Sequence, residues 1–380
     1  MNPGERAEVL KGWALEEGFD RAGVARLERA STGQAYLSWL ERGDHADMAY
    51  LTRRVELRLD PRQMLEEGAK TALCVALQYH PLTGEEAAEG DLWPWVARYA
   101  RGLDYHDLLR RRLQNLAERI TEGFPGSQCR PYVDTGPVLE RELGARAGLG
   151  AVGKNTNLLD GETGSWFFLG ELFLDLDLEP DTPVADLCGS CAACLEACPT
   201  GALPEPYRLD SNRCISYWTI EHRGVIPAEV RPTLGSWVFG CDICQEVCPV
   251  NTEPEARDHP ELRLTADRSD LDLAGLLTLG RESYVERFRG SPMKRAKQEG
   301  LQRNAAVAMG NLRDPGYVPA LAAALGSGSN LVRRHAAWAL GRIGGQTAED
   351  ILRKFLVIEE STEVRSEIRG ALEGAEAASG

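Results

Sequence analysis

The chain has 380 residues, of which 43% are hydrophobic and 27% are charged, as in ordinary soluble globular proteins. At roughly 100–200 residues per domain, this length predicts two or three domains. The net charge of −15 disfavours nucleic acid as a partner of the whole surface, although an acidic protein can carry a local basic stripe. No apolar run approaches the roughly 18–20 residues that cross a bilayer, so we expect no membrane segment.

The first element expected is an amphipathic helix within residues 1–19, with Val9, Leu10, Trp13 and Ala14 on one face. This stretch carries acidic residues early and has no apolar segment of the secretory kind. We therefore expect a cytoplasmic protein in a reducing compartment, where disulfides are rare.

Two β-rich runs follow among helical patterns, at residues 71–78 (TALCVALQ) and 165–175 (SWFFLGELFLD). Their alternation with helices predicts an α/β or α+β domain over residues 1–180. Residues 148–153 (GLGAVG) loosely match a dinucleotide-binding loop, but a charged, helix-like stretch precedes them where the full fingerprint has a strand. We favour the interpretation that these glycines let the main chain approach a large flat cofactor, with a dinucleotide site as the weaker alternative.

Residues 181–255 form the second predicted domain and hold eight of the ten cysteines. This segment has little hydrophobic periodicity, so we expect it to need metal cross-links. The first run has the bacterial ferredoxin spacing C-x2-C-x2-C-x3-C-P, and it contains Cys188, Cys191, Cys194 and Cys198. A second run lacks one cysteine, which Cys214 can replace, and it contains Cys241, Cys244 and Cys248. Eight thiolates are what two [4Fe–4S] clusters require.

The spacing also predicts how the two clusters share these ligands. The cysteine before the proline is badly placed for its own cluster and ligates the other one. One cluster is then expected on Cys188, Cys191, Cys194 and Cys248, and the other on Cys198, Cys214, Cys241 and Cys244. The alternative of two zinc sites usually shows separated CxxC pairs. Cys74 is expected in the core, and Cys129 receives no role.

Residues 256–380 are predicted to be all helical and to repeat. The stretches 301–310 (LQRNAAVAMG), 332–341 (VRRHAAWALG) and 364–373 (VRSEIRGALE) share an arginine-and-alanine pattern at offsets of 31 and 32. A recurring helix followed by a glycine and a second helix is typical of HEAT-like units, which stack with one exposed binding face. The alternative is a set of unrelated amphipathic helices.

Taken together, these features resemble the family of epoxyqueuosine reductases, cobalamin-dependent enzymes that complete the tRNA base queuosine. The ferredoxin runs are common to many proteins, but their combination with the other motifs is specific, and the resemblance covers nearly the whole chain. Besides the cysteine runs, it rests on residues 99–106 (YARGLDYH), 133–137 (VDTGP), 147–157 (AGLGAVGKNTN), 164–172 (GSWFFLGEL), 214–224 (CISYWTIEHRG) and 303–311 (RNAAVAMGN).

The resemblance implies that the chain reduces epoxyqueuosine to queuosine at the wobble position of tRNA. The electrons would come from Co(I) cobalamin, which an electron donor recharges through the two clusters. The departing oxygen needs a proton, and the resemblance gives that role of general acid to Asp134. An ordinary aspartate has a pKa near about 3.9, so we expect burial against the corrin to raise the pKa of Asp134.

The resemblance also implies contacts with the cofactor and with the RNA. Cobalamin contacts are expected from Arg58, Tyr99, Asp134, Lys154, Asn155, Thr156 and Ser216. Residues 281–303 locally reverse the sign of the charge, with seven basic residues against three acidic ones. We expect this patch to contact the anticodon stem-loop of the tRNA through Arg281, Arg287, Arg289, Lys294, Arg295, Lys297 and Arg303.

Two alternatives of other classes remain at this point. A reductive dehalogenase shares the cobalamin and cluster layout, but that family is typically exported with a twin-arginine leader. A protein that only transfers electrons or binds RNA would hold clusters but no corrinoid.

Overall fold

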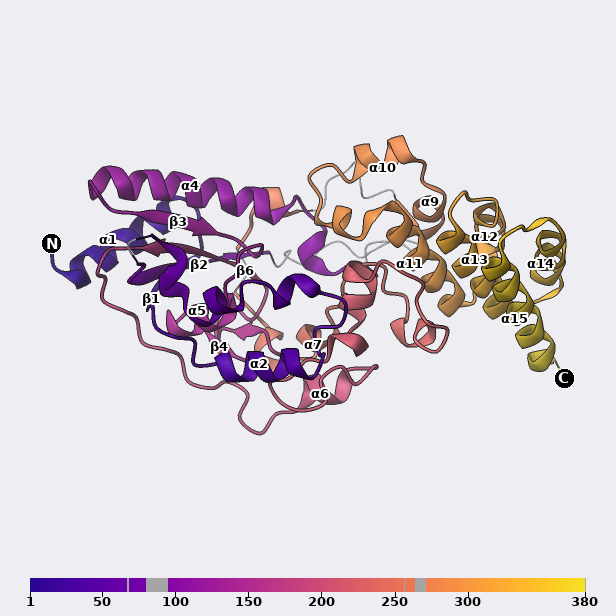
Figure 1. The fold of residues 1–380 in the computed structure, drawn as a ribbon, viewed down its shortest axis with the longest axis horizontal. Helices are drawn as coiled ribbons and strands as arrows, with labels where there is room; N and C mark the ends of the chain where they lie inside the picture. Colours follow the sequence, from indigo (N-terminus) through magenta and orange to yellow (C-terminus); the bar gives the residue numbers. More distant parts are fainter. Residues whose placement is uncertain (67, 80–94, 256, 264–270, 380) are drawn as a thin grey trace. The chain divides into compact units, whose positions relative to one another are not determined.

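The computed structural model describes residues 1–66, 68–79, 95–255, 257–263 and 271–379 (Figure 1). Contacts within the chain define two compact units, each made of discontinuous segments. The first unit contains residues 1–83, 102–212 and 242–263, and the second contains residues 84–101, 213–241 and 264–380. Within the described ranges, no helix has the length and apolarity needed to span a membrane.

The cysteine-rich residues 181–255 do not form a compact unit of their own. Residues 181–212 and 242–255 belong to the first unit, and residues 213–241 belong to the second. The lack of hydrophobic periodicity in this segment agrees with the arrangement, since such a segment gains its core by packing on larger neighbours.

The first unit is built on a four-stranded antiparallel sheet in the order β1-β2-β6-β3. The strands are β1 (Arg21–Arg26), β2 (Thr71–Gln78), β3 (Cys129–Tyr132) and β6 (Phe167–Leu174). The two strands expected from the sequence are therefore confirmed as β2 and β6. So is the mixed α/β class of this part of the chain.

Helices cover both faces of this sheet. The long helix α4 (Tyr105–Gly123) packs on β3 and β6, and α1 (Pro3–Glu16) packs on β1 and β2 (Figure 1). The short helix α5 (Glu140–Arg146) contacts β1, β2 and β6, and its Leu143 shares a core with Cys74 and Phe173. Because side chains alternate along a strand, every second residue of β6 faces α5.

The glycines of residues 148–153 serve the close approach of the chain to itself. Gly150 has φ +159°, and a Cβ there would lie 2.4 Å from the carbonyl oxygen of Leu159. This contact belongs to the hairpin of β4 (Ala151–Val152) and β5 (Leu158–Leu159). The structure thus gives these glycines a role within the chain, and the interpretation that they admit a flat cofactor stays a prediction. A helix, α5, precedes this loop where the dinucleotide fingerprint has a strand.

The second unit is helical, as expected. Its helices are α9 (Leu273–Thr278), α10 (Arg281–Arg287), α11 (Lys297–Leu312), α12 (Val318–Ala324), α13 (Asn330–Ile343), α14 (Gln346–Ile358) and α15 (Thr362–Ser379). The three repeated stretches lie on α11, α13 and α15, and α13 packs against both of the others. Small residues such as Ala305 and Ala336 are fully buried and let these helices approach one another.

Arg303 is fully buried in this unit. Its guanidinium donates hydrogen bonds to the carbonyl oxygens of Trp218 at 2.7 Å, His222 at 3.0 Å and Gly224 at 2.8 Å. Its other partner is Asn304, whose side chain reaches the carbonyl oxygens of Thr219 and Val238. The expectation that Arg303 contacts tRNA is therefore wrong, since this side chain ties α11 to residues 213–241 instead.

Candidate functional site

Asp134 lies in a tight loop directly after β3. Its φ is +48°, in the left-handed region that few residues other than glycine adopt. Its backbone N–H donates to the carboxylate of Glu140, at the start of α5, with N···Oε1 of 2.5 Å. The side chain of Asp134 itself remains 56% exposed. Glu140 thus holds the main chain of the loop, while the Asp134 carboxylate stays open on one side.

His106 connects this carboxylate to the start of α4. Asp104 is the N-cap of α4, and its carboxylate lies 2.7 Å from Nδ1 of His106. Nε2 of the same ring lies 2.9 Å from Oδ2 of Asp134, and the Tyr105 hydroxyl donates to that oxygen at 3.3 Å. The Asp134 carboxylate therefore has two partners that carry protons.

An aromatic stack fixes the position of these partners. The Tyr105 ring stacks on His106 at 4.0 Å and, on its other face, on Phe168 at 4.0 Å with an angle of 5° between the planes. Tyr79 packs on Phe168 at 4.6 Å. Phe168 belongs to β6, so the sheet sets where the imidazole can lie.

The electrostatics of this group place its protons on the imidazole. Burial lowers the pKa of His106, but hydrogen bonds and charges from Asp104 and Asp134 outweigh it and raise the pKa to about 9. Partial burial acts to raise the pKa of Asp134, yet the hydrogen bond and charge of His106, with Tyr105 and Arg141, hold it below its ordinary value. The chain by itself therefore holds Asp134 ionised and His106 protonated at neutral pH, and the expected rise in the pKa of Asp134 on burial against the corrin stays a prediction.

Four of the cluster cysteines interact within the first unit. They lie on or beside α6 (Ala193–Ala197) and α7 (Ile243–Glu246), which pack against each other. Burial raises the pKa of Cys194, and the charges of Cys188 and Cys248 add to it. Burial also raises the pKa of Cys248, with further contributions from Cys188 and Cys191. All ten cysteines are free thiols, so this quartet is available to ligate a cluster.

Lys154 and Asn155 hold the cysteine loops in place. The backbone N–H of Lys154 donates to Sγ of Cys188 at 3.4 Å, and its ammonium group donates to the carbonyl oxygens of Gly189 and Cys191 at 2.7 and 2.8 Å. The amide of Asn155 donates to the carbonyl oxygen of Cys244 at 3.1 Å. N–H groups aimed at cluster sulfurs stabilise their negative charge. The expected corrin contacts of Lys154 and Asn155 stay predictions.

The four cysteines expected on the other cluster belong to different units. Cys198 and Cys244 belong to the first unit, and Cys214 and Cys241 to the second. Burial acts to raise the pKa of Cys198, but hydrogen bonds from Thr200 and the Ala202 N–H outweigh it and lower the pKa, which favours the thiolate. The grouping of these four cysteines on one cluster stays a prediction.

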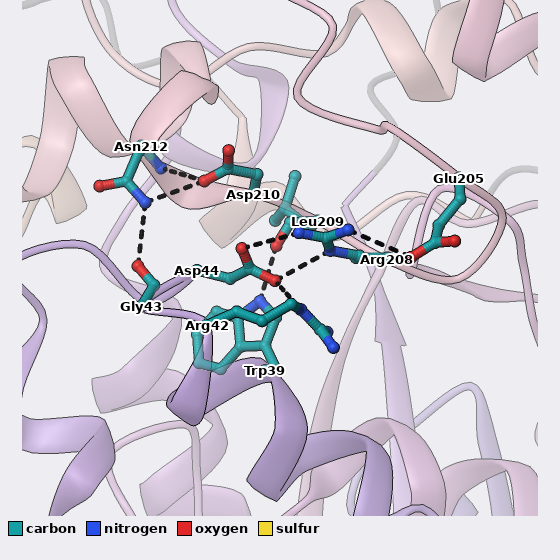
Figure 2. Close-up of polar contacts among 9 residues, drawn as sticks. All are labelled: Trp39, Arg42, Gly43, Asp44, Glu205, Arg208, Leu209, Asp210 and Asn212. Carbon is teal, nitrogen blue, oxygen red and sulfur yellow. Dashed lines mark hydrogen bonds and ion pairs between the residues drawn. The ribbon is translucent and has the colours of Figure 1, made fainter.

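A clamp of polar contacts fixes the chain between Cys198 and Cys214 (Figure 2). Its centre is Asp44, which is 3% exposed and follows α2 (Gly33–Glu41). The Asp44 carboxylate receives hydrogen bonds from Arg42 at 2.9 Å and from two nitrogens of Arg208 at 2.9 and 3.1 Å. Trp39 and Asn212 add contacts between the same two segments, through the carbonyl oxygens of Leu209 and Gly43. The segment leading to Cys214 is therefore anchored to the first unit up to Asn212.

The other residues expected to contact cobalamin make different contacts within the chain. Arg58 is buried and donates to the carbonyl oxygen of Arg53 at 2.5 Å. Thr156 is half-buried and accepts a hydrogen bond from Arg141, the neighbour of Glu140 in sequence. In the second unit, Tyr99 packs its ring against Phe239, and Ser216 directly precedes a π-helical turn at Tyr217–Glu221. Such turns are frequent at functional sites.

Six of the seven expected tRNA contacts lie at the surface of the second unit. Five side chains are exposed and Arg287 is half-buried; the five are Arg281, Arg289, Lys294, Arg295 and Lys297. Arg295 forms a two-pronged ion pair with Glu221 at 2.9 and 2.8 Å. The charge of Arg223 acts to lower the pKa of Tyr284, as do the charges of Arg281 and Lys294. Arg223 therefore belongs to the same basic patch. The sequence window of 281–303 missed Arg223, because the folded chain brings it there from residues 213–241.

The residues around Asp134 were not predicted as site residues from the sequence. They are Asp104, Tyr105, His106, Glu140 and Glu171, and the last is a fully buried acid on β6. An aspartate before a helix with histidine two residues later was a visible signal for Asp104 and His106. No local pattern marks Glu140 or Glu171, since only the fold brings them near the loop.

Comparison with known proteins gives three matches to family models. Residues 58–135 match "Epoxyqueuosine reductase QueG, DUF1730", residues 187–251 match "4Fe-4S double cluster binding domain", and residues 293–373 match "HEAT repeats".

Similar whole proteins give the same picture. The epoxyqueuosine reductase of Pseudomonas aeruginosa is 40% identical over 356 residues, which is 90% of this chain and 96% of that relative. The Escherichia coli epoxyqueuosine reductase is 38% identical over 88% of this chain and 89% of its own. A crystal structure of epoxyqueuosine reductase with an epoxyqueuosine-modified tRNA-Tyr stem loop is 31% identical, covers 98% of this chain and 99% of that one, and has a TM-score of 0.89.

Proposed function

Because the chain belongs to the family of epoxyqueuosine reductases, we propose that it reduces epoxyqueuosine to queuosine at the wobble position of tRNA. The observation that carries this proposal is 40% identity over 90% of the chain, which includes the Asp134 loop and both cysteine runs. The reaction removes the epoxide oxygen as water and consumes two electrons and two protons. The enzyme is an oxidoreductase, and we place it in the cytoplasm with its tRNA substrate.

Asp134 is the group that protonates the departing oxygen. Its exposed carboxylate meets the substrate, and His106, at 2.9 Å, is the proton source behind it. General acid catalysis needs a proton within hydrogen-bond reach of the reacting atom, and this pair keeps one there at neutral pH. Asp104 and the ring of Tyr105 hold the imidazole in the orientation that serves Asp134.

The chain carries the donor set for two [4Fe–4S] clusters. Cys188, Cys191, Cys194 and Cys248 hold one of them, and the remaining four cysteines hold the other. The thiols fit this role because they are free, influence one another electrostatically and receive main-chain N–H groups.

Cobalamin, when bound, supplies strongly reducing Co(I), and the clusters restore its electrons from a donor. The polar groups that we expect to contact it include the hydroxyl groups of Thr156 and Ser216 and the exposed carboxylate of Asp134. Hydroxyl and carboxylate groups of this kind suit the amide side chains of a corrin ring. Tyr99 and Arg58 complete the set that we assign to the cofactor, with Lys154 and Asn155 supporting it from the cluster loops.

The basic patch of the second unit contacts the anticodon stem-loop. Its exposed arginines and lysines suit a phosphate backbone, which binds through charge rather than sequence. The wobble base must leave its stack to reach Asp134, as in other enzymes that act on a base.

The test is turnover of tRNA isolated from cells that lack this reductase. The purified chain, reconstituted with iron, sulfide and cobalamin and reduced chemically, should convert epoxyqueuosine to queuosine in nucleoside mass spectrometry. Asp134→Asn should abolish the conversion while tRNA binding persists, and Asp107→Asn, on the exposed side of α4, should convert normally. Unchanged epoxyqueuosine with the native chain would refute the function.

A further inference from the structure

Glu171 is an unusual residue for the centre of a sheet. It is fully buried in β6, and both of its carboxylate oxygens lack a hydrogen-bond partner among the described residues. A buried ionised carboxylate without partners is very costly, so such a group keeps its proton instead. Glu171 therefore carries a proton that no interaction of the fold requires.

The position of Glu171 is at the root of the Asp134 loop. It pairs with Tyr132, the last residue of β3, in the β3–β6 register, and Asp134 follows two residues later. Residues paired in this way have Cα atoms about 4.5–5.5 Å apart. Glu171 also shares its face of β6 with Leu169 and Phe173, which pack on the side of the sheet that α5 covers.

Glu140 links Glu171 to the loop. It begins α5, on the same side of the sheet, and its carboxylate accepts the backbone N–H of Asp134 at 2.5 Å. The charge of Asp134 adds to the desolvation of Glu140, and the charges of Glu140 and Asp134 add to that of Glu171. Both glutamates therefore retain their protons at neutral pH.

We propose that Glu140 and Glu171 form an acid pair that stores the second proton of the reduction and delivers it through Asp134. The proposal rests on the function proposed above. Two electrons, which the electron donor of the proposed function supplies, break both C–O bonds of the epoxide and form the alkene. The oxygen leaves as water with two protons. Asp134 takes the first proton from His106 and passes it to the oxygen. It then takes the second proton from the acid pair and passes that on as well. Solvent then restores both protons.

The protonation of the pair agrees with this role. Partial burial raises the pKa of Glu140 to about 8, with the charge of Asp134 adding to the rise. Burial raises the pKa of Glu171 well above its ordinary value, and the charges of Glu140 and Asp134 add to it. A leaving alkoxide is a far stronger base than any carboxylate, so transfer from the pair through Asp134 runs downhill.

Other charged groups face this pair from each element packed on it. On β2, the Cys74 thiol lies directly across from Glu171. On α5, the charge of Arg141 acts to lower the pKa values of Glu140 and Asp134. The charge of Arg146 acts to lower the pKa of Cys74. From α4, His106 lowers the pKa of both Glu140 and Asp134. These positive groups leave the pair protonated, because its desolvation is the larger effect.

The stored proton can be tested by infrared spectroscopy of the reconstituted protein, without turnover. The native protein at pH 7 should show the carbonyl stretches of two protonated carboxyl groups, and Glu171→Gln, an isosteric change, should remove one of them and leave that of Glu140. Glu118→Gln, on the exposed side of α4, should leave both bands in place. Absence of these bands from the native protein, or an unchanged pair of bands in Glu171→Gln, would overturn the proposal.

The delivery of the proton is tested by kinetics. Glu171→Gln should lower kcat on the order of tenfold with an unchanged KM for tRNA, since proton transfer contributes about 10²–10⁴-fold to catalysis and one of two protons is affected. The decline of kcat at alkaline pH should move down toward pH 8, where Glu140 alone remains as the store. Glu171→Asp should restore part of the rate, which a purely structural role would not predict.

These outcomes separate the inference from the function on which it rests. If the native enzyme reduces epoxyqueuosine and Glu171→Gln does so at the same rate with the same pH profile, the acid pair is not the store. If the native enzyme leaves epoxyqueuosine unchanged, the proposed function fails, and the infrared band still decides whether Glu171 carries a proton. Glu140→Gln provides the same kinetic test should Glu171→Gln fold poorly.

Discussion

His106 and Asp134 are joined by a hydrogen bond of 2.9 Å between Nε2 of the imidazole and Oδ2 of the carboxylate. Asp104 holds the opposite ring nitrogen at 2.7 Å, so the imidazole lies between two negative charges. This arrangement stabilises the imidazolium ion and explains why the pKa of His106 is raised to about 9. The proton for Asp134 thus sits on a neighbour that is charged throughout the neutral pH range.

We expect His106 to titrate near pH 9 and to respond to Asp134. Asp134→Asn removes one of the two carboxylates and should lower the pKa of His106 by about one unit or more. NMR of protein labelled at the histidine rings, recorded from pH 6 to 10, measures this directly. Asp107→Asn should leave the titration in place. A ring that titrates at its ordinary pKa in the native protein would show that Asp134 is not its partner.

The stability of the protein should fall as pH rises from about 5 to 9. Glu140 and His106 both have pKa values that are raised in the folded state, to about 8 and about 9. Such groups contribute stability that is complete below their unfolded pKa and is lost as pH rises through the folded pKa. Glu140→Gln removes one of these contributions and should flatten the decline by about 1 kcal/mol or more. Thermal unfolding as a function of pH checks this, and a decline as steep as that of the native protein would contradict it.

Iron content should distinguish the ligating cysteines from the other two. Cys248→Ser removes a ligand of the first quartet, so iron should fall from about eight to about four atoms per chain. Cys129→Ser should retain all of it, because Cys129 lies in β3, away from the two cysteine runs. Iron and sulfide analysis of anaerobically reconstituted protein measures both. Zinc in place of iron in the native protein would refute the cluster assignment.

Arg303→Met should destabilise the second unit from its core, because the side chain is fully buried and is not part of the basic patch. It leaves the carbonyl oxygens of Trp218, His222 and Gly224 without their donor, and unpaired buried polar groups are costly. We expect the free energy of unfolding to fall by about 2–4 kcal/mol. Denaturant unfolding of the full chain tests this against Arg369→Gln, a change on the exposed face of α15 that should be neutral.

The basic patch should show itself in the salt dependence of tRNA binding. Arg289→Gln should weaken binding and reduce the slope of log K against log salt by about 1, the effect of one lost phosphate contact. Binding of the anticodon stem-loop, measured at several salt concentrations, gives this slope. Arg369→Gln should keep the native slope. Equal slopes for the two variants would place the RNA elsewhere.

Local patterns in the sequence predicted much of the fold. The β-rich runs at residues 71–78 and 165–175 predicted β2 and β6, and the arginine-and-alanine repeats predicted α11, α13 and α15. The cysteine spacing predicted a set of ligands, because a cluster is wrapped by one short loop.

Features that depend on tertiary contacts could not be read in the same way. Arg303 belongs by sequence to a basic run, yet its position on α11 turns it toward residues 213–241 and into the core. Glu171 stands among apolar residues of β6, and only the packing of α5 on that strand brings Glu140 near it. The hydrogen bond that lowers the pKa of Asp134 in the chain itself was not predicted, because its partner His106 comes from α4, distant in sequence.

The chain from Asp134 to Lys154 is one continuous stretch through the loop, α5 and the first strand of the small hairpin. Its first residue carries the carboxylate that His106 contacts, and its last residue donates its N–H to Sγ of Cys188 and its ammonium group to the carbonyl oxygens of Gly189 and Cys191. A deletion anywhere in this stretch would displace both ends together, and loss of the iron–sulfur site and misalignment of the acid would appear as a single phenotype. In the proposed mechanism, the transfer of electrons and the transfer of protons therefore both depend on the length of one short piece of polypeptide.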